Sequence, residues 1–296
     1  MAVATSEART TSSRTRSGGH HVRKLLRMNW LGGLAGWIWL LIVIIPLYWI
    51  VITSFKDQSA FFSQNPFALP NAPTWENYKL VIQNDFPRYF LNSVIITVGT
   101  IVPAVAISFM ASYAIIRGVG SKFLGGVMGL FLLGLAIPLQ AVIIPVYLLI
   151  IKMQLYDSLL ALILPSIAFA IPLSVLVLTN FIRDVPKELF ESMRVDGASE
   201  WQMLHSLALP LTRPALVTVS IYNGLFVWNG FLLPLILTQS PEKRTLPLAL
   251  WTFQGQFSVN VPAVLASVVL TALPIVILYA IGRRQLLSGL TAGFSR

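Results

Sequence analysis

The interval DVPKELFESMRVDGASEWQMLHSLALPLTRP, residues 184–214, is the longest polar stretch in the last two-thirds of a very apolar chain. Its first residue, Asp184, precedes a proline by two positions, and Glu188 follows within the first turn. A capping side chain, an early proline and an acid near the positive helix end are typical of a helix start. We therefore expect a helix from about Pro186 to Arg194.

A second helix is expected immediately after the first. Asp196-Gly197 ends the first helix, because glycine readily adopts the left-handed conformation found at helix C-termini. Ser199 and Gln202 have the S-x-x-Q spacing of a capping box, which begins a helix. The expected apolar stripe of this helix consists of Trp201, Leu204, Leu207 and Ala208. The prolines expected to end the helix are Pro210 and Pro214.

The composition of the whole chain is that of a membrane protein. Of 296 residues, 56% are hydrophobic and 11% are charged, whereas charged residues make up about 25% of a typical soluble domain. The chain has no cysteine, which excludes a disulfide, an iron–sulfur cluster and a thiol nucleophile. Its three histidines do not form a metal-binding pattern. The net charge of +10 indicates basic ends that face anionic lipid and cytoplasm rather than a nucleic-acid partner.

Six apolar runs are each long enough to cross a bilayer, which takes roughly 20 residues of helix. We expect an all-α, polytopic membrane protein. Residues 1–29 are expected to form a disordered basic cytoplasmic tail, and residues 30–296 one transmembrane domain. The 184–214 interval joins the fourth span to the fifth. The expected spans are residues 31–52, 91–115, 124–151, 159–182, 215–238 and 263–281.

Lysine and arginine are divided unevenly between the two sides of these spans. Fifteen lie in the tail, the C-terminus and the loops after the second and fourth spans, and six lie in the other loops. Because cytoplasmic segments carry the excess of basic residues, we expect both termini and residues 184–214 in the cytoplasm. Residues 53–90 then form the largest external segment.

Residues 184–214 resemble the EAA loop of ATP-binding-cassette importer permeases. Glu191 begins the Glu-Ala-Ala triplet of that motif, Gly197 is its glycine, and Leu207-Ala208-Leu209-Pro210 is its aliphatic-x-Leu-Pro ending. Ser192-Met193 stands where two alanines are usual. The resemblance implies that the loop couples the chain to a separate ATPase. The implied coupling residues are Glu188, Glu191, Ser192, Met193, Asp196, Gly197, Ala198, Leu209 and Pro210.

Further motifs extend the resemblance over about residues 33–293. They look like those of the smaller permease subunit of maltose-type carbohydrate importers, in the same order and at similar spacing. They are Phe90-Leu91-Asn92-Ser93, Ala111-Ser112-Tyr113-Ala114, Ile137-Pro138, Ile144-Pro145-Val146-Tyr147, Trp228-Asn229, Arg244-Thr245-Leu246-Pro247 and Gly289-Leu290-Thr291-Ala292-Gly293. The resemblance implies a further ATPase contact through the last motif: Gly289, Leu290, Thr291, Ala292 and Gly293. The ending Phe294-Ser295-Arg296 departs from the pattern.

The resemblance implies a non-catalytic subunit of an importer in the plasma membrane of a bacterium or archaeon. Its implied partners are a homologous second permease, two ATPase subunits, an extracellular or periplasmic solute-binding protein, a carbohydrate and the lipid bilayer. The chain has no G-x-x-x-x-G-K-[ST] phosphate loop. ATP and Mg²⁺ are therefore expected on the ATPase partner, and no cofactor is expected in this chain.

Other function classes agree less well with the residues. The alternative is a secondary transporter or channel for a neutral solute, but ion-coupled carriers usually keep ionisable residues within the membrane, and the last five expected spans have none. A membrane-embedded enzyme would need catalytic acids or a metal at membrane depth. Candidates along a sugar path are Asn92, Gln140, Tyr147, Asn223, Trp228 and Asn229, with hydrogen bonding between helices or an interface anchor as the alternative role.

Overall fold

The computed structural model describes residues 30–118, 120–250 and 259–292. The chain divides into two units, Met1–Trp49 and Ile50–Arg296. The described part of the first unit is one helical segment, and every regular element of the described part of the second unit is a helix. An all-α fold is therefore confirmed over these residues. The expected N-terminal tail lies outside them.

The described residues form the following helices in chain order. They are α2 (Trp30–Ser54), α3 (Gln58–Ser63), α4 (Glu76–Gln83), α5 (Phe86–Arg117), α6 (Lys122–Leu135), α7 (Leu139–Lys152), α8 (Leu160–Arg183), α9 (Lys187–Val195), α10 (Glu200–Met203), the π-helix η1 (Leu204–Ala208), α11 (Leu209–Leu211), α12 (Arg213–Trp228), α13 (Leu232–Leu237), the 3₁₀-helix η2 (Pro241–Lys243), α14 (Leu246–Ala249) and α15 (Val261–Ala292).

Three helices, α2, α5 and α8, are each long and apolar enough to cross a membrane. The expected span over residues 124–151 is divided between α6 and α7, which meet at an angle of 105°. The break falls at Ala136, Ile137 and Pro138, and Pro138 has the extended backbone of an N-cap. Proline lacks a donor and disfavours helical backbone in the residue before it, which explains the break.

The expected span over residues 215–238 is likewise divided, because Asn229, Gly230 and Phe231 separate α12 from α13. The side chain of Asn229 donates to the carbonyl oxygen of Leu225 at 2.8 Å and so satisfies a main-chain acceptor at the helix end. A Cβ on Gly230 would lie 3.0 Å from a main-chain oxygen, so the close turn suits glycine. The apolar part of α15, Val261–Ile277, is shorter than the other spans.

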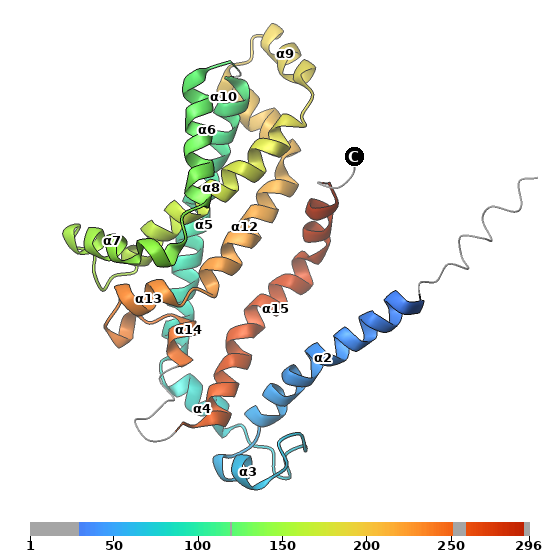
Figure 1. Cartoon of the computed structure of the whole chain (residues 1–296), viewed down its shortest axis with the longest axis vertical. Helices are drawn as coiled ribbons and strands as arrows, with labels where there is room; N and C mark the ends of the chain where they lie inside the picture. The colour runs from blue at the N-terminus through green and yellow to red at the C-terminus, as the bar shows by residue number, and fades with distance from the viewer. Residues whose placement is uncertain (1–29, 119, 251–258, 293–296) are drawn as a thin grey trace, which may run out of the picture. The chain divides into compact units, whose positions relative to one another are not determined.

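Helices α5 and α8 pack side by side in the second unit (Figure 1). Small buried residues face α8 from α5, and the hydroxyl of Ser112 donates to the carbonyl oxygen of Val175 at 3.2 Å. Small residues allow helix backbones to approach closely within a membrane. Helix α12 joins this pair through Asn223, whose amide donates to the hydroxyl of Ser174 at 2.8 Å.

A buried polar cluster lies where the chain leaves α2 and enters α4. Lys56 is 1% exposed, and its ammonium donates to the carbonyl oxygens of Asn65 and Pro66 at 3.0 and 3.3 Å. The amide of Asn77 donates to the carbonyl oxygens of Ser54 and Lys56 at 2.9 and 2.7 Å. The hydroxyls of Ser54 and Tyr78 are 2.7 Å apart. We call this set the Asn77 cluster: Ser54, Lys56, Asn77 and Tyr78.

Candidate functional site

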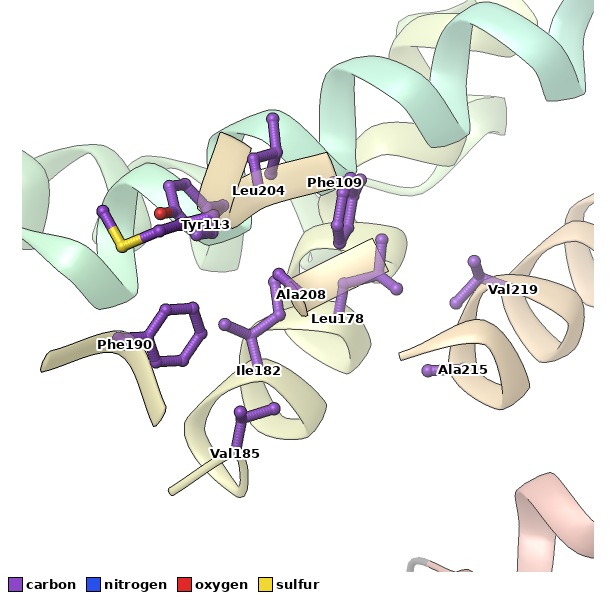
Figure 2. Packing of buried hydrophobic residues seen from close by; sticks show 11 residues of the cluster. Phe109, Tyr113, Leu178, Ile182, Val185, Phe190, Leu204, Ala208, Ala215 and Val219 are labelled. Atoms are coloured by element: carbon purple, nitrogen blue, oxygen red, sulfur yellow. The ribbon is translucent and has the colours of Figure 1, made fainter. Parts of the chain in front are cut away.

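One buried hydrophobic cluster holds the interval that resembles the coupling loop against the long helices. Figure 2 shows its side chains converging from separate segments of the second unit. Phe190 is the buried residue of α9, with 2% of its surface exposed. Burying such a side chain contributes roughly 1.5–3 kcal/mol, so the interval is anchored. The cluster consists of Phe109, Tyr113, Leu178, Ile182, Val185, Phe190, Met203, Leu204, Ala208, Ala215 and Val219.

The first helix of the interval, α9, spans Lys187–Val195, which confirms the expected helix. The prediction that Asp184 caps it is wrong, because Asp184 is the C-cap of α8 and Pro186 stands at the N-cap of α9. The preceding helix continues to Arg183, one residue beyond the apolar run. Asp184 is therefore used at the end of one helix rather than at the start of the next.

The turn after α9 has the expected left-handed glycine. Gly197 has φ +82°, and no atom lies within 4 Å of where its Cβ would be. The N–H of Gly197 donates to the carbonyl oxygen of Arg194 at 3.1 Å, and the N–H of Ala198 to that of Met193 at 2.9 Å. This is the pair of bonds of a Schellman motif. The backbone conformation, and not the space around it, is what requires glycine here.

The second helix begins with the expected capping box. The hydroxyl of Ser199 accepts from the N–H of Gln202 at 3.3 Å, and the side chain of Gln202 accepts from the N–H of Ser199 at 2.7 Å. The prediction that Pro210 ends this helix is wrong, because α10, η1 and α11 continue to Leu211. The π-turn widens the backbone just before the proline, whose ring crowds a normal α-turn. The helix ends at Thr212, beyond which α12 departs at 74°.

The apolar stripe of the second helix differs from the expectation at one position. Leu204 and Ala208 are buried as expected, but Trp201 is 66% exposed, and Met203 is buried instead. Trp201 lies within the capping box and is not part of the hydrophobic cluster. The interval therefore exposes several apolar side chains that its own fold does not cover: Leu189, Val195 and Trp201.

The expected coupling residues lie mostly on the exposed side of the interval. Among the described residues, Glu191 forms no salt bridge with Lys187 or Arg194. The hydroxyl of Ser192 donates to the carbonyl oxygen of Leu189 at 3.0 Å. The exposed members of the expected set are Glu188, Glu191, Ser192, Asp196, Gly197 and Pro210. The half-buried members are Met193, Ala198 and Leu209.

A carboxylate that was not among the expected site residues lies at the centre of the interval. Glu200 accepts a hydrogen bond from the hydroxyl of Tyr113 at 2.7 Å and pairs with Arg117 at 3.5 Å and with Arg194. The guanidinium of Arg117 also lies 4.8 Å from the centre of the Phe190 ring, a cation–π distance. The hydrogen bond from Tyr113, together with the two arginines, holds the pKa of the Glu200 carboxyl below its ordinary value. We call Tyr113, Arg117, Arg194 and Glu200 the Glu200 cluster.

The sequence contained a signal for this cluster. The motif Ala111-Ser112-Tyr113-Ala114 ends the second expected span, and Arg117 follows Tyr113 by four residues, on the same helix face. Glu200 lies inside the capping box, where an acid is already explained by the helix N-terminus. Sequence spacing therefore left the pairing of Tyr113 with Glu200 undetected, because the two residues are 87 positions apart.

Three of the expected path residues form hydrogen bonds to another element of the chain. The amide of Asn92 donates to the carbonyl oxygens of Glu242 and Arg244 at 2.8 and 2.9 Å. Asn223 bonds to α8 as described above. The indole of Trp228 is buried and lies 3.4 Å from the carbonyl oxygen of Thr271. These side chains connect elements of the second unit.

The remaining path candidates are spread over α7 and the α12–α13 break. Gln140 is exposed at the start of α7, and Tyr147 packs edge-on against Tyr156. Asn229 lines a cavity of about 280 Å³. The hydroxyl of Thr245, also in the cavity wall, has no hydrogen-bond partner within the described part of the chain. The wall consists of Ser93, Ile96, Leu139, Leu162, Ser166, Phe226, Val227, Asn229, Gly230, Phe231, Leu232, Leu233, Pro234 and Thr245.

The expected C-terminal contact lies at the end of α15. Gly289, Leu290, Thr291 and Ala292 belong to that helix, and Gly293 lies outside the described residues. Within the part of the chain that the structure describes, no three His, Cys, Asp or Glu side chains are grouped as metal ligands would be.

The family of binding-protein-dependent transport system inner membrane components matches residues 104–286. This chain belongs to that family. The permease is 40% identical to a putative ABC transporter permease of a Caldicellulosiruptor species, over 86% of this chain and 93% of that protein. It is 34% identical to the diacetylchitobiose uptake permease DasC of Streptomyces coelicolor, over 85% and 91% of the two chains. It is 32% identical to the arabinooligosaccharide transport permease AraQ of Halalkalibacterium halodurans, over 85% and 91%.

Solved structures show the same fold. The permease matches a chain in a crystal structure of a bacterial ABC transporter involved in alginate import, with a TM-score of 0.73. The two chains are 22% identical, and the match covers 93% of this chain and 99% of the other. The expected membership in the sugar permeases of ABC importers is confirmed by the family match and by the sequence relatives named above.

Proposed function

We propose that this permease forms, with a homologous second permease, the path by which a carbohydrate crosses a bacterial plasma membrane. Two separate ATPase subunits would bind ATP and Mg²⁺, and an external solute-binding protein would deliver the sugar. The relatives named for diacetylchitobiose and arabinooligosaccharides support this substrate class. A related transporter structure holds a periplasmic protein with an alginate pentasaccharide bound, which supports the external partner.

We further propose six membrane crossings with both ends in the cytoplasm. The crossings are α2, α5, the bent α6–α7 pair, α8, α12 and α15, and the fifteen-to-six division of basic residues supports this orientation. Single cysteines at Ser12, Ser199 and Ser288 should resist a membrane-impermeant thiol reagent in intact cells, and one at Asn71 should react. Labelling of Ser199→Cys from outside would contradict the topology.

The observation that carries the proposal is the two-sided construction of α9 and α10. Phe190 and Met203 fasten these helices to the buried cluster, while Val195, four residues after Glu191 in α9, is 87% exposed. Exposed apolar side chains on the same short helices as a charged residue suit burial in a groove of another protein. The interval would thus connect the long helices to a separate subunit that supplies the energy. The proposal assigns this role to the ATPase subunit.

The proposal is tested by removing the exposed carboxylate while leaving the anchor intact. We expect Glu191→Ala to insert and fold normally, because the side chain has no partner among the described residues. Loss of a charge that pairs in a desolvated groove costs on the order of 2–5 kcal/mol. Sugar uptake in cells and ATPase stimulation by the solute-binding protein should therefore fall at least tenfold, which about 1.4 kcal/mol already produces.

The control for this test is Glu242→Gln, an exposed acid in η2 at the other end of α5. It should leave uptake unchanged. Wild-type uptake and wild-type ATPase association in Glu191→Ala would show that Glu191 is only a solvated charge. Transport by the purified chain in vesicles without any ATPase would refute the importer assignment and favour a secondary transporter or channel.

A further inference from the structure

The Glu200 cluster brings together side chains from three helices, α5, α9 and α10. Tyr113 and Arg117 come from the last turns of α5, Arg194 from the last turn of α9, and Glu200 from the first turn of α10. The carboxylate accepts from the tyrosine at 2.7 Å and pairs with both guanidinium groups. One acid therefore connects both helices of the interval to α5.

The charges of the Glu200 cluster are each placed favourably with respect to the dipole of their own helix. Arg117 and Arg194 lie at the negative ends of α5 and α9, and Glu200 lies at the positive end of α10. Without Glu200, two cations would remain close together with no acid between them. The side chain of Glu200 is 53% exposed, so its removal leaves the buried cluster intact. Its contribution is to orientation more than to folding.

Helix α5 also makes a polar contact at its other end. Asn92, near the start of the helix, bonds to the main chain at Glu242 and Arg244, and Tyr113 bonds to Glu200 near its end. The helix between them is unbroken from Phe86 to Arg117. Because Glu200 is bonded to both Tyr113 and Arg117, a rotation or shift of α5 would act on α10 through Glu200.

We infer that Glu200 is a positioning residue that fixes the orientation of α9 and α10 relative to α5, so that the two helices move with α5 when the ATPase acts. This inference rests on the proposed coupling function. Tyr113 is the matching residue on α5, and Arg117 and Arg194 complete the connection.

The test uses the assembled transporter, with both permeases and both ATPases, reconstituted in vesicles. The measured quantity is the ratio of ATPase rates with and without the solute-binding protein, which is added as purified from the same cells. Glu200→Gln and Tyr113→Phe both preserve side-chain shape, and the phenylalanine keeps the ring in the hydrophobic cluster. We expect the ratio to fall about three- to tenfold in each, as for the loss of one hydrogen-bonded contact.

A double variant separates positioning from simple loss of stability. Because Tyr113 acts through Glu200, combining Tyr113→Phe with Glu200→Gln should lower the ratio no further than Glu200→Gln alone.

The matched control is Asp184→Asn, another exposed carboxylate in the same interval, which pairs with no basic side chain among the described residues. It should keep the wild-type ratio. The amount of ATPase that co-purifies should be unchanged in all of these variants.

Three outcomes would overturn the inference. A wild-type ratio in Glu200→Gln, with coupling lost in Glu191→Ala, would refute the role of Glu200 and leave the proposed function standing. Normal coupling in both variants would refute the proposed function as well. Failure of both Glu200→Gln and Tyr113→Phe to assemble would show that the cluster serves folding alone.

Discussion

The Asn77 cluster and the Glu200 cluster lie near opposite ends of α5 and are built in different ways (Figure 1). In the first, Lys56 and Asn77 are buried and donate to main-chain carbonyl oxygens. In the second, the contacts join one side chain to another, and Glu200 is half-exposed. A buried cluster cannot open without leaving carbonyl groups unpaired, whereas water can replace the contacts of an exposed one. One end of the permease is therefore fixed, and the other can rearrange.

The largest expected effect on stability comes from a change in the buried Asn77 cluster. Asn77→Ala removes the donor to two buried carbonyl oxygens and should lower the free energy of unfolding by about 2–4 kcal/mol. The thermal unfolding midpoint of the purified protein in detergent measures this. The control is Glu76→Gln, which breaks the exposed pair with Lys79 on the same helix and should cost less than about 1 kcal/mol. Equal effects would contradict the contrast between the clusters.

The next effect concerns the turn beside the Glu200 cluster. Gly197→Ala places a side chain on a left-handed residue and should destabilise by about 1–2 kcal/mol, although the space around it is open. Gly125→Ala is the matched control, because Gly125 is inside α6 with equally open surroundings. That change should stabilise by roughly 0.5–1 kcal/mol. The two unfolding midpoints should thus shift in opposite directions, and a shared direction would disprove the argument from backbone conformation.

Acid should weaken the Glu200 cluster and leave the amide contacts of Asn77 unchanged. The hydrogen bond from Tyr113 lowers the pKa of Glu200 from its ordinary value of 4.5. The stabilisation is therefore complete above that pH and is lost as pH falls through the lowered pKa. Hydrogen exchange of the α10 amides should accelerate below about pH 4.5, after correction for the intrinsic rate, while that of the α4 amides should not. Parallel acceleration in both helices would indicate global unfolding instead.

The smallest effect is expected from Arg194→Gln. Arg194 and Glu200 form an exposed pair, and such pairs contribute about 0–1 kcal/mol. The unfolding midpoint should stay close to that of the wild type, although one contact of the Glu200 cluster is lost. A large drop in the midpoint would show that this cluster is as structural as the buried one.

The local pattern of residues was sufficient to predict those features that depend on residues close together in the chain. The apolar runs predicted long helices, and the spacing of Ser199 and Gln202 predicted a capping box that the structure confirms. Gly197 was predicted to be left-handed and is. The apolar runs over residues 124–151 and 215–238 are each divided between two helices, at breaks beside Pro138 and Gly230. A hydrophobic run indicates that a segment lies in the membrane. It does not indicate whether the segment is one straight helix or two helices at an angle.

The sequence by itself determined the class of this protein, the helices of the 184–214 interval and the family to which it belongs. Tertiary structure alone decided which side chains of that interval are anchored and which are exposed. Trp201 was expected to be buried and is exposed, while Phe190 and Met203 are the anchors. The partnership of Glu200 with Tyr113 also required the fold. These properties depend on how α5, α8 and α12 approach the interval, and contacts between residues far apart in the chain leave no period or spacing for sequence analysis to detect.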